Sequence, residues 1–299
     1  MSWINDNTLN WFQSLVLRIV KTGQIPGHVA LIMDGNRRYS NKQNLRKVEG
    51  TLRGFIKMTE TLNWCMHLGI TEITVYAYSI ENFQRSKEEV DIFIDFVKQG
   101  FKCLLEEREK LQKAGVCIRV IGNLSFLPKD MCKLIAEAIV ITKDNNKIIF
   151  NLALSYTSRD EVTSAIRDIG RGVKRGEILP EDVDEDLIND CLYFYKSPNP
   201  DLLIRTSGET RLSDFLMWQI ADSCIYFTDV LWPEFSIWNF LAAIFYYQRC
   251  FPDLQKKRNT TPIVRNSRVS MFIDKLHRER DIMIENMYLS DLSTVSRNK

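Results

Sequence analysis

The sequence has no uninterrupted apolar run of the 18 or so residues that a membrane-spanning helix needs. The longest candidate covers residues 235–248. The N-terminus also lacks the basic start of a cleaved signal peptide, because Asp6 stands there and Gln13 and Arg18 interrupt its apolar part. We therefore expect neither a transmembrane segment nor a cleaved leader.

The sequence also lacks a large excess of positive or negative charge. The chain has 40 Lys+Arg and 38 Asp+Glu, a formal net charge of +2, so no overall basic field favours a nucleic-acid partner. The seven cysteines form no CxxC pair and have no histidine at zinc-ligand spacing, a pattern typical of reduced cytosolic thiols. We expect no nucleic acid and no structural zinc, and any anion site must be local.

Several motifs of catalysis are absent. There is no GxxxxGK[ST] loop, no GxGxxG after the first predicted strand and no GxSxG elbow, which removes support for nucleotide hydrolysis, dinucleotide redox chemistry and serine hydrolysis. The acidic stretch DVDEDLIND at 182–190 lacks the DDxxD spacing of the all-helical prenyl-transferring enzymes. We interpret it as an exposed helix start.

Short β-rich runs alternate with helical patterns along the 299 residues, and no linker-like segment precedes residue 252. The predicted strands are 28–33, 73–79, 116–121, 148–154, 202–206 and 225–228. The predicted helices are 42–68, 86–114, 128–144, 158–175, 184–192 and 235–249, with a last one near 270–288. This alternation predicts a single α/β domain with a mostly parallel six-stranded sheet flanked by helices.

The N-terminal segment, residues 1–23, carries apolar side chains at helical spacing: Ile4, Trp11, Phe12, Leu15, Val16 and Ile19. Such an amphipathic helix either lies in a membrane interface or packs on the domain or on a partner subunit. The stripe fits both alternatives. Residues 24–251 form the predicted catalytic domain, and residues 252–299 form a C-terminal tail that is partly helical.

The first predicted strand ends in IMDGNRRYS, which sets Asp34, Gly35, Arg37 and Arg38 where ligands bind in parallel sheets. A carboxylate, a close backbone approach and two guanidinium groups suit a diphosphate bridged by a hard divalent cation. The alternative is an ordinary Asp-Gly turn with solvated arginines.

Two further strand ends are equally polar. The second carries Ser79, Glu81, Asn82, Phe83 and Arg85, and the fifth carries Arg205, Thr206, Ser207, Arg211 and Ser213. Five arginines thus stand at three strand ends in a chain of almost no net charge, and two adjacent phosphoryl sites account for them better than solvation does.

The helical pattern over 86–114 is rich in large apolar side chains, namely Val90, Phe93, Ile94, Phe96, Val97, Phe101, Leu104 and Leu105. Core packing explains this face. Together with the strand IIFNLAL it equally well walls a cavity for a long apolar tail, and the sequence does not separate the two.

Four segments resemble the cis-prenyltransferases, the family of undecaprenyl and dehydrodolichyl diphosphate synthases. They are HVALIMDGNRRYS, ITVYAYSIENFQRS, LLIRTSGETRLSDFLMWQ and YFTDVLWPEF. The similarity spans about residues 24–250. The opening MSWI, DGNRR and AYSIENF most resemble the catalytic subunit of the animal dehydrodolichyl type.

The resemblance implies that Asp34 binds Mg²⁺ with a diphosphate and assigns the other site residues by position. Gly35, Asn36, Arg37 and Arg38 would hold an allylic diphosphate; Arg205, Arg211 and Ser213 would hold isopentenyl diphosphate; Ser79, Asn82 and Arg85 would lie near the reacting ends, and Tyr39 and Phe83 beside the substrates. No nucleophilic side chain is needed.

Three departures from the family pattern stand out. Thr51 replaces a histidine that is frequent in the family, Cys224 replaces a bacterial glutamate that helps to chelate the metal, and no Arg-X-Gly motif follows residue 249. The last departure implies a heterodimer in which a partner similar to the Nogo-B receptor supplies that loop.

The expected function is Mg²⁺-dependent elongation of farnesyl diphosphate with isopentenyl diphosphate into a long polyprenyl diphosphate, the dolichol precursor for protein glycosylation. The alternative is a non-catalytic scaffold subunit of a prenyltransferase complex. The resemblance implies peripheral attachment at the cytosolic face of the endoplasmic reticulum membrane.

Overall fold

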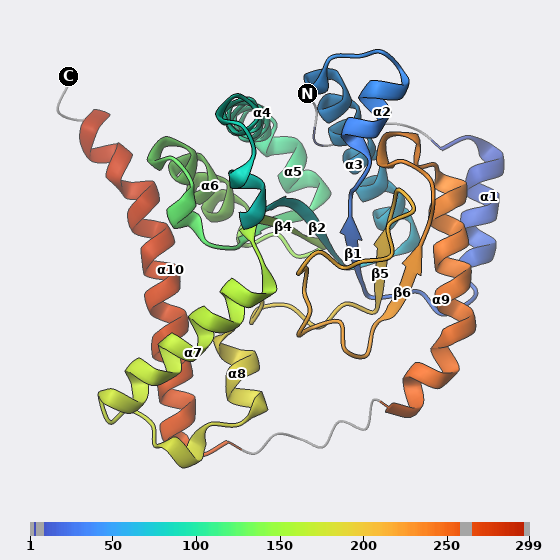
Figure 1. Cartoon of the computed structure of the whole chain (residues 1–299). Helices are drawn as coiled ribbons and strands as arrows, with labels where there is room; N and C mark the ends of the chain where they lie inside the picture. Colours follow the sequence, from blue (N-terminus) through green and yellow to red (C-terminus); the bar gives the residue numbers. More distant parts are fainter. Residues whose placement is uncertain (1–2, 4–8, 258–264, 296–299) are drawn as a thin grey trace.

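The computed structural model describes Trp3 and residues 9–257 and 265–295, and its centre is a six-stranded sheet (Figure 1). The strands are β1 (His28–Ile32), β2 (Glu72–Ser79), β3 (Val116–Ile121), β4 (Ile148–Tyr156), β5 (Leu202–Arg205) and β6 (Cys224–Phe227). Their order is β3-β4-β2-β1-β5-β6, and every neighbouring pair is parallel. The predicted fold class and all six predicted strands are confirmed.

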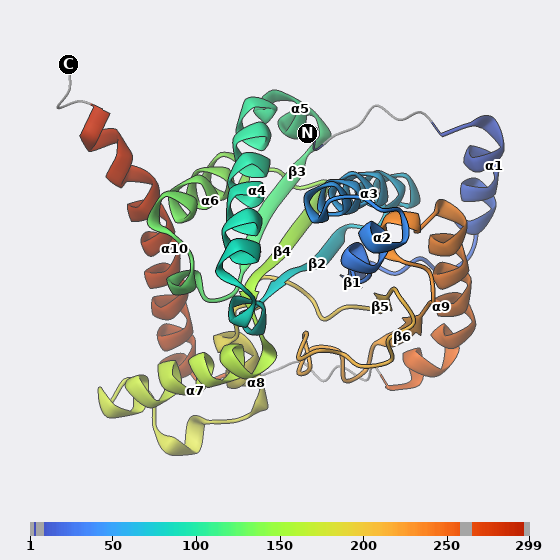
Figure 2. The ribbon, with the colours of Figure 1, turned by 45° about the horizontal axis from the view of Figure 1, so that its top comes forward.

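Helices connect and cover the strands (Figure 2). They are α1 (Trp11–Val20), α2 (Asn36–Lys42), α3 (Lys47–Leu68), α4 (Lys87–Glu106), α5 (Arg108–Ala114), α6 (Lys129–Thr142), α7 (Ser158–Lys174), α8 (Glu185–Cys191), α9 (Ile237–Lys257) and α10 (Ser267–Val295). A short 3-10 helix, η1 (Ile80–Gln84), follows β2. No helix in the described part of the chain is long and apolar enough to cross a membrane.

Three predicted helices differ from the observed ones. The pattern over 42–68 predicts one helix, but α2 ends at Lys42 and α3 begins at Lys47, with Asn44 at φ +52° between them. The pattern over 86–114 is broken at Glu107, which separates α4 from α5. The helix expected to end at 249 continues to Lys257 through Pro252, because Phe251 and Leu254 pack against the core.

The sheet is buried on both faces, which explains why its strands read as continuous apolar runs. Val29 and Leu31 of β1 point into the larger core under the helices. Ala30 and Ile32 point to the opposite face, into a second cluster with Phe215 and others from the segment after β5. Alternation along β1 therefore fixes which strand residues reach each layer.

The two ends of the chain pack on the domain where they are described. Leu17 and Val20 of α1 are buried in the larger core. The C-terminal helix α10 crosses α6 and α8 and buries Phe272 and Leu276 in a third cluster with α7 and α8 (Figure 1). The predicted domain limits at residues 23 and 251 stay a prediction; α9 runs continuously across the second.

Candidate active site

A cavity of about 900 Å³ opens at the carboxyl ends of the strands. Because the strands are parallel, the loops that follow β1, β2 and β5 meet at this one edge. Eleven of the thirteen predicted site residues line it: Asp34, Gly35, Asn36, Arg37, Arg38, Ser79, Asn82, Arg85, Arg205, Arg211 and Ser213. The sequence-based expectation that these strand ends converge is therefore met by the geometry.

Asp34 follows β1 and is held on several sides. Its backbone N–H donates to Thr206 Oγ1 (3.1 Å), and its carbonyl accepts from Trp232 N (3.0 Å). Oδ1 accepts from the backbone N–H of Gly35 (2.7 Å), and Oδ2 accepts from Arg205 Nη2 (2.9 Å). Burial opposes ionisation, but these hydrogen bonds and the nearby arginine charges prevail, so the pKa of Asp34 lies below its ordinary value.

Arg205, the last residue of β5, is 2% exposed and connects two loops. Nη2 donates to Asp34, while Nη1 donates to Ser213 Oγ (2.8 Å) and to the carbonyl of Arg211. Its Nε is buried without a protein partner. A guanidinium with an unused donor at the wall of a polar cavity suits an additional oxygen ligand.

Arg38 lies on the other side of Asp34. Its Nη1 donates to the carbonyl of Ser207 (2.8 Å), and its Nη2 donates to Ser207 Oγ (2.5 Å). Its guanidinium is also 3.7 Å from the Asp34 carboxylate and 3.5 Å from that of Glu209. Glu209 in turn pairs with Arg211. The carboxylates thus hold three arginines near one another, which reduces the repulsion between them.

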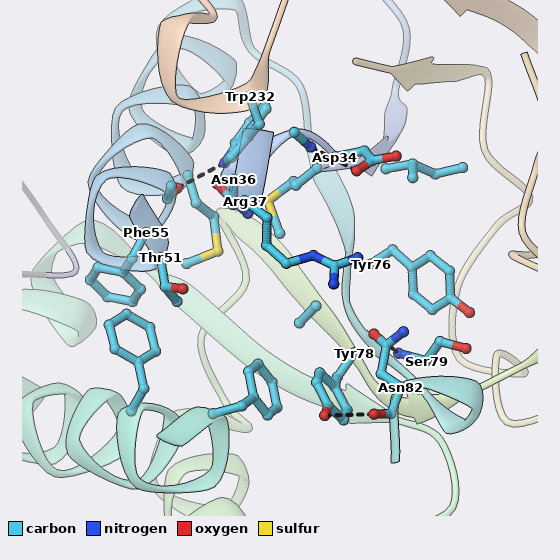
Figure 3. A pocket seen from close by; sticks show the side chains of 18 of the residues that line it. Asp34, Asn36, Arg37, Thr51, Phe55, Tyr76, Tyr78, Ser79, Asn82 and Trp232 are labelled. Carbon is cyan, nitrogen blue, oxygen red and sulfur yellow. Dashed lines mark hydrogen bonds between the residues drawn. The ribbon is translucent and has the colours of Figure 1, made fainter. Parts of the chain in front are cut away.

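A second basic group lies across the cavity. Arg37 of α2 extends toward the loop that carries Ser79 and Asn82 (Figure 3). Burial and the nearby charge of Arg37 lower the pKa of Arg85. Two guanidinium groups that raise each other's electrostatic energy favour the binding of a negatively charged ligand between them.

Ser79 and Asn82 shape the loop after β2. Ser79 Oγ accepts from Glu81 N (3.1 Å), and Asn82 Oδ1 accepts from Ser79 N (3.3 Å), which closes a reciprocal cap on η1. The Tyr78 hydroxyl donates to the Asn82 carbonyl (3.1 Å; Figure 3). The two residues therefore fix the loop in the free protein, and both still border the cavity.

The cavity continues away from the arginines into an apolar end. Its walls come from α3, α4 and β4, and include Phe55, Met58, Phe93, Phe96, Val97, Phe101, Leu152 and Leu154. Phe55 and Phe96 meet edge to face with centroids 5.9 Å apart. The two interpretations of the apolar helix face are thus both correct: part of it walls the cavity, while Leu104 lies in the core.

Trp3 closes the apolar end and was not predicted. Its indole is 3% exposed, its Nε1 donates to the Gly100 carbonyl (2.8 Å), and its backbone N–H donates to Glu107 Oε2 (2.8 Å). The ring meets Phe55 at 5.1 Å. Nothing local in the sequence indicated this placement, because it depends on a contact between residues 97 positions apart.

Two predicted residues do not line the cavity. Tyr39 of α2 is not among the lining residues, and Phe83 packs against Tyr78 (5.1 Å between centroids). Of the family-pattern departures, Thr51 lines the cavity and donates to the Lys47 carbonyl (3.1 Å). Cys224 is 5% exposed in β6, outside the lining, and burial raises the pKa of its thiol to about 12.

Lys47 and Glu89 also line the cavity and were missed. Lys47 Nζ lies 2.5 Å from Glu89 Oε1, and Arg37 lies 4.0 Å from the same carboxylate. Both come from helix N-termini rather than strand ends, so the polar strand ends of the sequence do not predict them.

The donor set limits which metal would fit. Within the described residues no three His, Cys, Asp or Glu side chains form a metal-binding group. One carboxylate, Asp34, stands among arginines that attract phosphate. Mg²⁺ is commonly bound by one or two carboxylates plus substrate phosphates and water, whereas zinc needs a fuller protein ligand set. The residues present therefore fit a phosphate-bridged Mg²⁺.

A protein-family model described as putative undecaprenyl diphosphate synthase matches residues 32–252. Among curated proteins, the mouse dehydrodolichyl diphosphate synthase complex subunit (Mus musculus) is 52% identical over 87% of this chain and 78% of its own, and the human one is 51% identical over the same shares. A Thermococcus kodakarensis tritrans,polycis-undecaprenyl-diphosphate synthase specific for geranylgeranyl diphosphate is 43% identical, over 80% of this chain and 90% of its own.

A solved structure has the same architecture. Lavandulyl diphosphate synthase from Lavandula x intermedia, crystallised with dimethylallyl diphosphate, superimposes with a TM-score of 0.71 over 75% of this chain and 95% of that chain, at 32% identity. That protein binds a short allylic diphosphate.

Proposed function

The chain belongs to the undecaprenyl diphosphate synthase family of prenyltransferases, and from this premise we propose that it extends farnesyl diphosphate with isopentenyl diphosphate units into a long polyprenyl diphosphate, the dehydrodolichyl precursor of dolichol. One observation carries the proposal: five arginines, from three strand-end loops, border the polar end of a cavity whose other end is apolar. Of the two interpretations drawn from the sequence, the relatives support the catalytic one and not the scaffold subunit.

The geometry suits two diphosphates and one growing hydrocarbon chain. Breaking an allylic C–O bond puts charge on the departing diphosphate, and guanidinium groups stabilise that charge more in the transition state than in the ground state. Arg37, Arg38 and Arg85 would hold the allylic diphosphate, and Arg205 and Arg211 the isopentenyl diphosphate. Holding both substrates places the isopentenyl double bond against the allylic carbon.

Asp34 would hold Mg²⁺ together with a diphosphate oxygen. When bound, the ion neutralises charge on the leaving diphosphate. The depressed pKa of Asp34 keeps the carboxylate ionised over the neutral range, which is the form a hard cation requires. Arg205 donates to this carboxylate through Nη2, and its Nε, which has no protein partner, would be the donor left for a phosphate oxygen.

A partner subunit of the Nogo-B-receptor type would complete the site. The mouse and human relatives are named as complex subunits, and this sequence has no Arg-X-Gly motif after residue 249. An arginine and a flexible glycine supplied by a partner would add one more donor to the diphosphate end. Expressing the chain with and without such a partner, and comparing polyprenyl synthesis, tests this part of the proposal.

The proposed location is the cytosolic face of the endoplasmic reticulum membrane, with peripheral attachment. It is supported by the outer face of α1, where Trp11 is 78% and Ile19 58% exposed, and by the exposed Trp238 of α9, whose neighbour Phe12 lies 5.8 Å away. Exposed aromatic and aliphatic groups favour a lipid interface. Replacing Trp11 and Ile19 by Ser should abolish flotation of the complex with vesicles; unchanged flotation would contradict the proposal.

The function is tested with the complex and radiolabelled isopentenyl diphosphate. Asp34→Ala should reduce incorporation into polyprenyl diphosphate at least about a hundredfold, since it removes the proposed metal ligand. Asp222→Ala, a change of the same size at an exposed position after β5, serves as the control and should leave turnover near the wild-type rate. Full activity of the Asp34 variant would refute the assignment.

A further inference from the structure

Arg159, the second residue of α7, contacts both polar loops of the site without lining the cavity. Its Nε donates to Asp214 Oδ2 (2.8 Å), and its Nη2 donates to Glu81 Oε1 (3.1 Å). Asp214 belongs to the loop that carries Arg211 and Ser213. Glu81 belongs to η1, so one guanidinium joins the loops after β5 and β2.

The Asp214 loop has a conformation that needs external support. Ser213, Asp214 and Leu216 have φ values of +51°, +58° and +49°, a region that residues with a side chain rarely adopt. Such backbone persists only where its surroundings over-determine it. The start of α7 supplies much of that support: Ser158 N donates to the Asp214 carbonyl (2.8 Å), and Arg159 N donates to Asp214 Oδ1 (3.3 Å).

The position of Arg159 is unfavourable for the helix itself. A cation in the first turn opposes the helix dipole, and α7 otherwise begins with Asp160 and Glu161, as helices prefer. The side chain is 77% exposed, so its two ion pairs contribute little to overall stability. The planar guanidinium group of Arg159 instead reaches two carboxylates at once with different N–H donors, which the single ammonium group of a lysine cannot reproduce.

We infer that Arg159 is a positioning residue for the second substrate: by binding Asp214 and Glu81 together, it sets the place of Ser213 and Arg211 relative to Asn82 and Arg85. The inference rests on the proposed function. Ser213 accepts from Arg205 on the cavity side (2.8 Å) while its neighbour Asp214 is held from outside, so a shift of Asp214 moves the diphosphate contacts directly.

The test measures the KM of each substrate separately for the complex. Arg159→Ala should raise the KM for isopentenyl diphosphate about tenfold, which corresponds to the upper range of the energy that two exposed ion pairs contribute. The KM for farnesyl diphosphate should stay within about twofold of the wild-type value. Arg159→Lys should recover only part of the loss. The control is Arg167→Ala, which removes the same charge from an exposed position of α7 and should change neither KM.

A merely structural role predicts a different pattern, in which both KM values stay unchanged and only the folded fraction falls. That result, or an equal rise in both KM values, would overturn the inference. Should Arg159→Ala fail to fold, Glu81→Ala removes one arm of the bridge, leaves α7 intact, and should raise the same KM. Unchanged KM values in Glu81→Ala would then overturn it.

Inorganic diphosphate separates this inference from the proposed function. Titration calorimetry on the wild-type complex and on Arg159→Ala should show weaker binding to the variant by about the same factor. If the wild type binds diphosphate but makes no polyprenyl product, the proposed function fails. If the wild type is active and the variant binds diphosphate equally well, only the role of Arg159 fails.

Discussion

Arg205 donates to the Asp34 carboxylate at 2.9 Å, and this buried guanidinium thereby ties the end of β5 to the end of β1. The two strands are neighbours in the sheet, with Ile32 in register with Arg205. The pair therefore lies where the backbone places it, and both partners are held by further hydrogen bonds before any ligand binds. Prearranged charges of this kind require little reorganisation during a reaction.

Replacing Arg205 by Lys should strongly reduce polyprenyl synthesis. A lysine keeps the charge but cannot reach Asp34, Ser213 and the Arg211 carbonyl together, since it lacks the planar fork. We expect polyprenyl synthesis to fall at least about a hundredfold, with a stability loss of about 1–3 kcal/mol from unsatisfied buried groups. Steady-state kinetics and urea unfolding measure both; near-normal kinetics would show that the fork is not needed.

Trp3→Ala should lengthen the product. The indole closes the apolar end of the cavity, so its removal leaves more room for a growing chain. Chromatographic separation of the polyprenyl products by length provides the measurement. Trp11→Ala, which removes an indole that is 78% exposed, is the matched control and should leave the distribution unchanged. An unaltered distribution in the Trp3 variant would mean that chain length is set elsewhere.

Gly50→Ala should disturb the helix that carries Arg37 and Arg38. A Cβ at Gly50 of α3 would lie 1.9 Å from Ser40 Oγ and 2.9 Å from the Asn36 carbonyl, so α2 must shift. We expect a loss of about 1–3 kcal/mol in unfolding free energy and reduced turnover.

The control for this change is Gly170→Ala in α7, where nothing lies within 4 Å of the added carbon. There the helix propensity of alanine should stabilise the protein by about 0.5–1 kcal/mol. Equal effects of the two substitutions would contradict the packing argument. Thermal unfolding and kinetics of both variants decide between the outcomes.

The buried His28 should make the stability of the protein depend on pH, with a loss of stability in mild acid. Its ring is 1% exposed, with Nε2 2.8 Å from Thr74 Oγ1 and Nδ1 2.7 Å from the Pro198 carbonyl, and burial lowers its pKa below 6.5. Below pH 6.5 the unfolded chain binds a proton that the folded protein does not, so stability falls by up to about 1.4 kcal/mol per pH unit for this group.

Urea unfolding at several pH values below and above 6.5 measures this slope. His28→Gln should flatten it, although the variant is less stable at neutral pH. His67→Gln alters a histidine on the exposed surface of α3 and should keep the wild-type slope. A slope that His28→Gln leaves unchanged would assign the pH dependence to other groups, among them His277, whose pKa is also lowered by burial.

Much of the site could be predicted because a parallel sheet converts sequence position into spatial position. Asp34, Arg85 and Arg205 lie far apart in the chain, yet each follows a strand, and all strand ends of such a sheet meet at one edge. Tyr39 and Phe83 show the limit of this rule. They neighbour site residues in sequence, but on a helix or a 3-10 turn adjacent side chains point in different directions.

The sequence by itself determined the six strands, their parallel arrangement and the basic character of their carboxyl ends, because hydrophobic period and turn residues are local properties of the chain. Only the tertiary structure decided that Trp3 closes the cavity, that Lys47 and Glu89 border it, and that Arg159 joins two loops from outside. Those contacts link residues whose separation leaves no periodic trace, and they form only once the layers have packed.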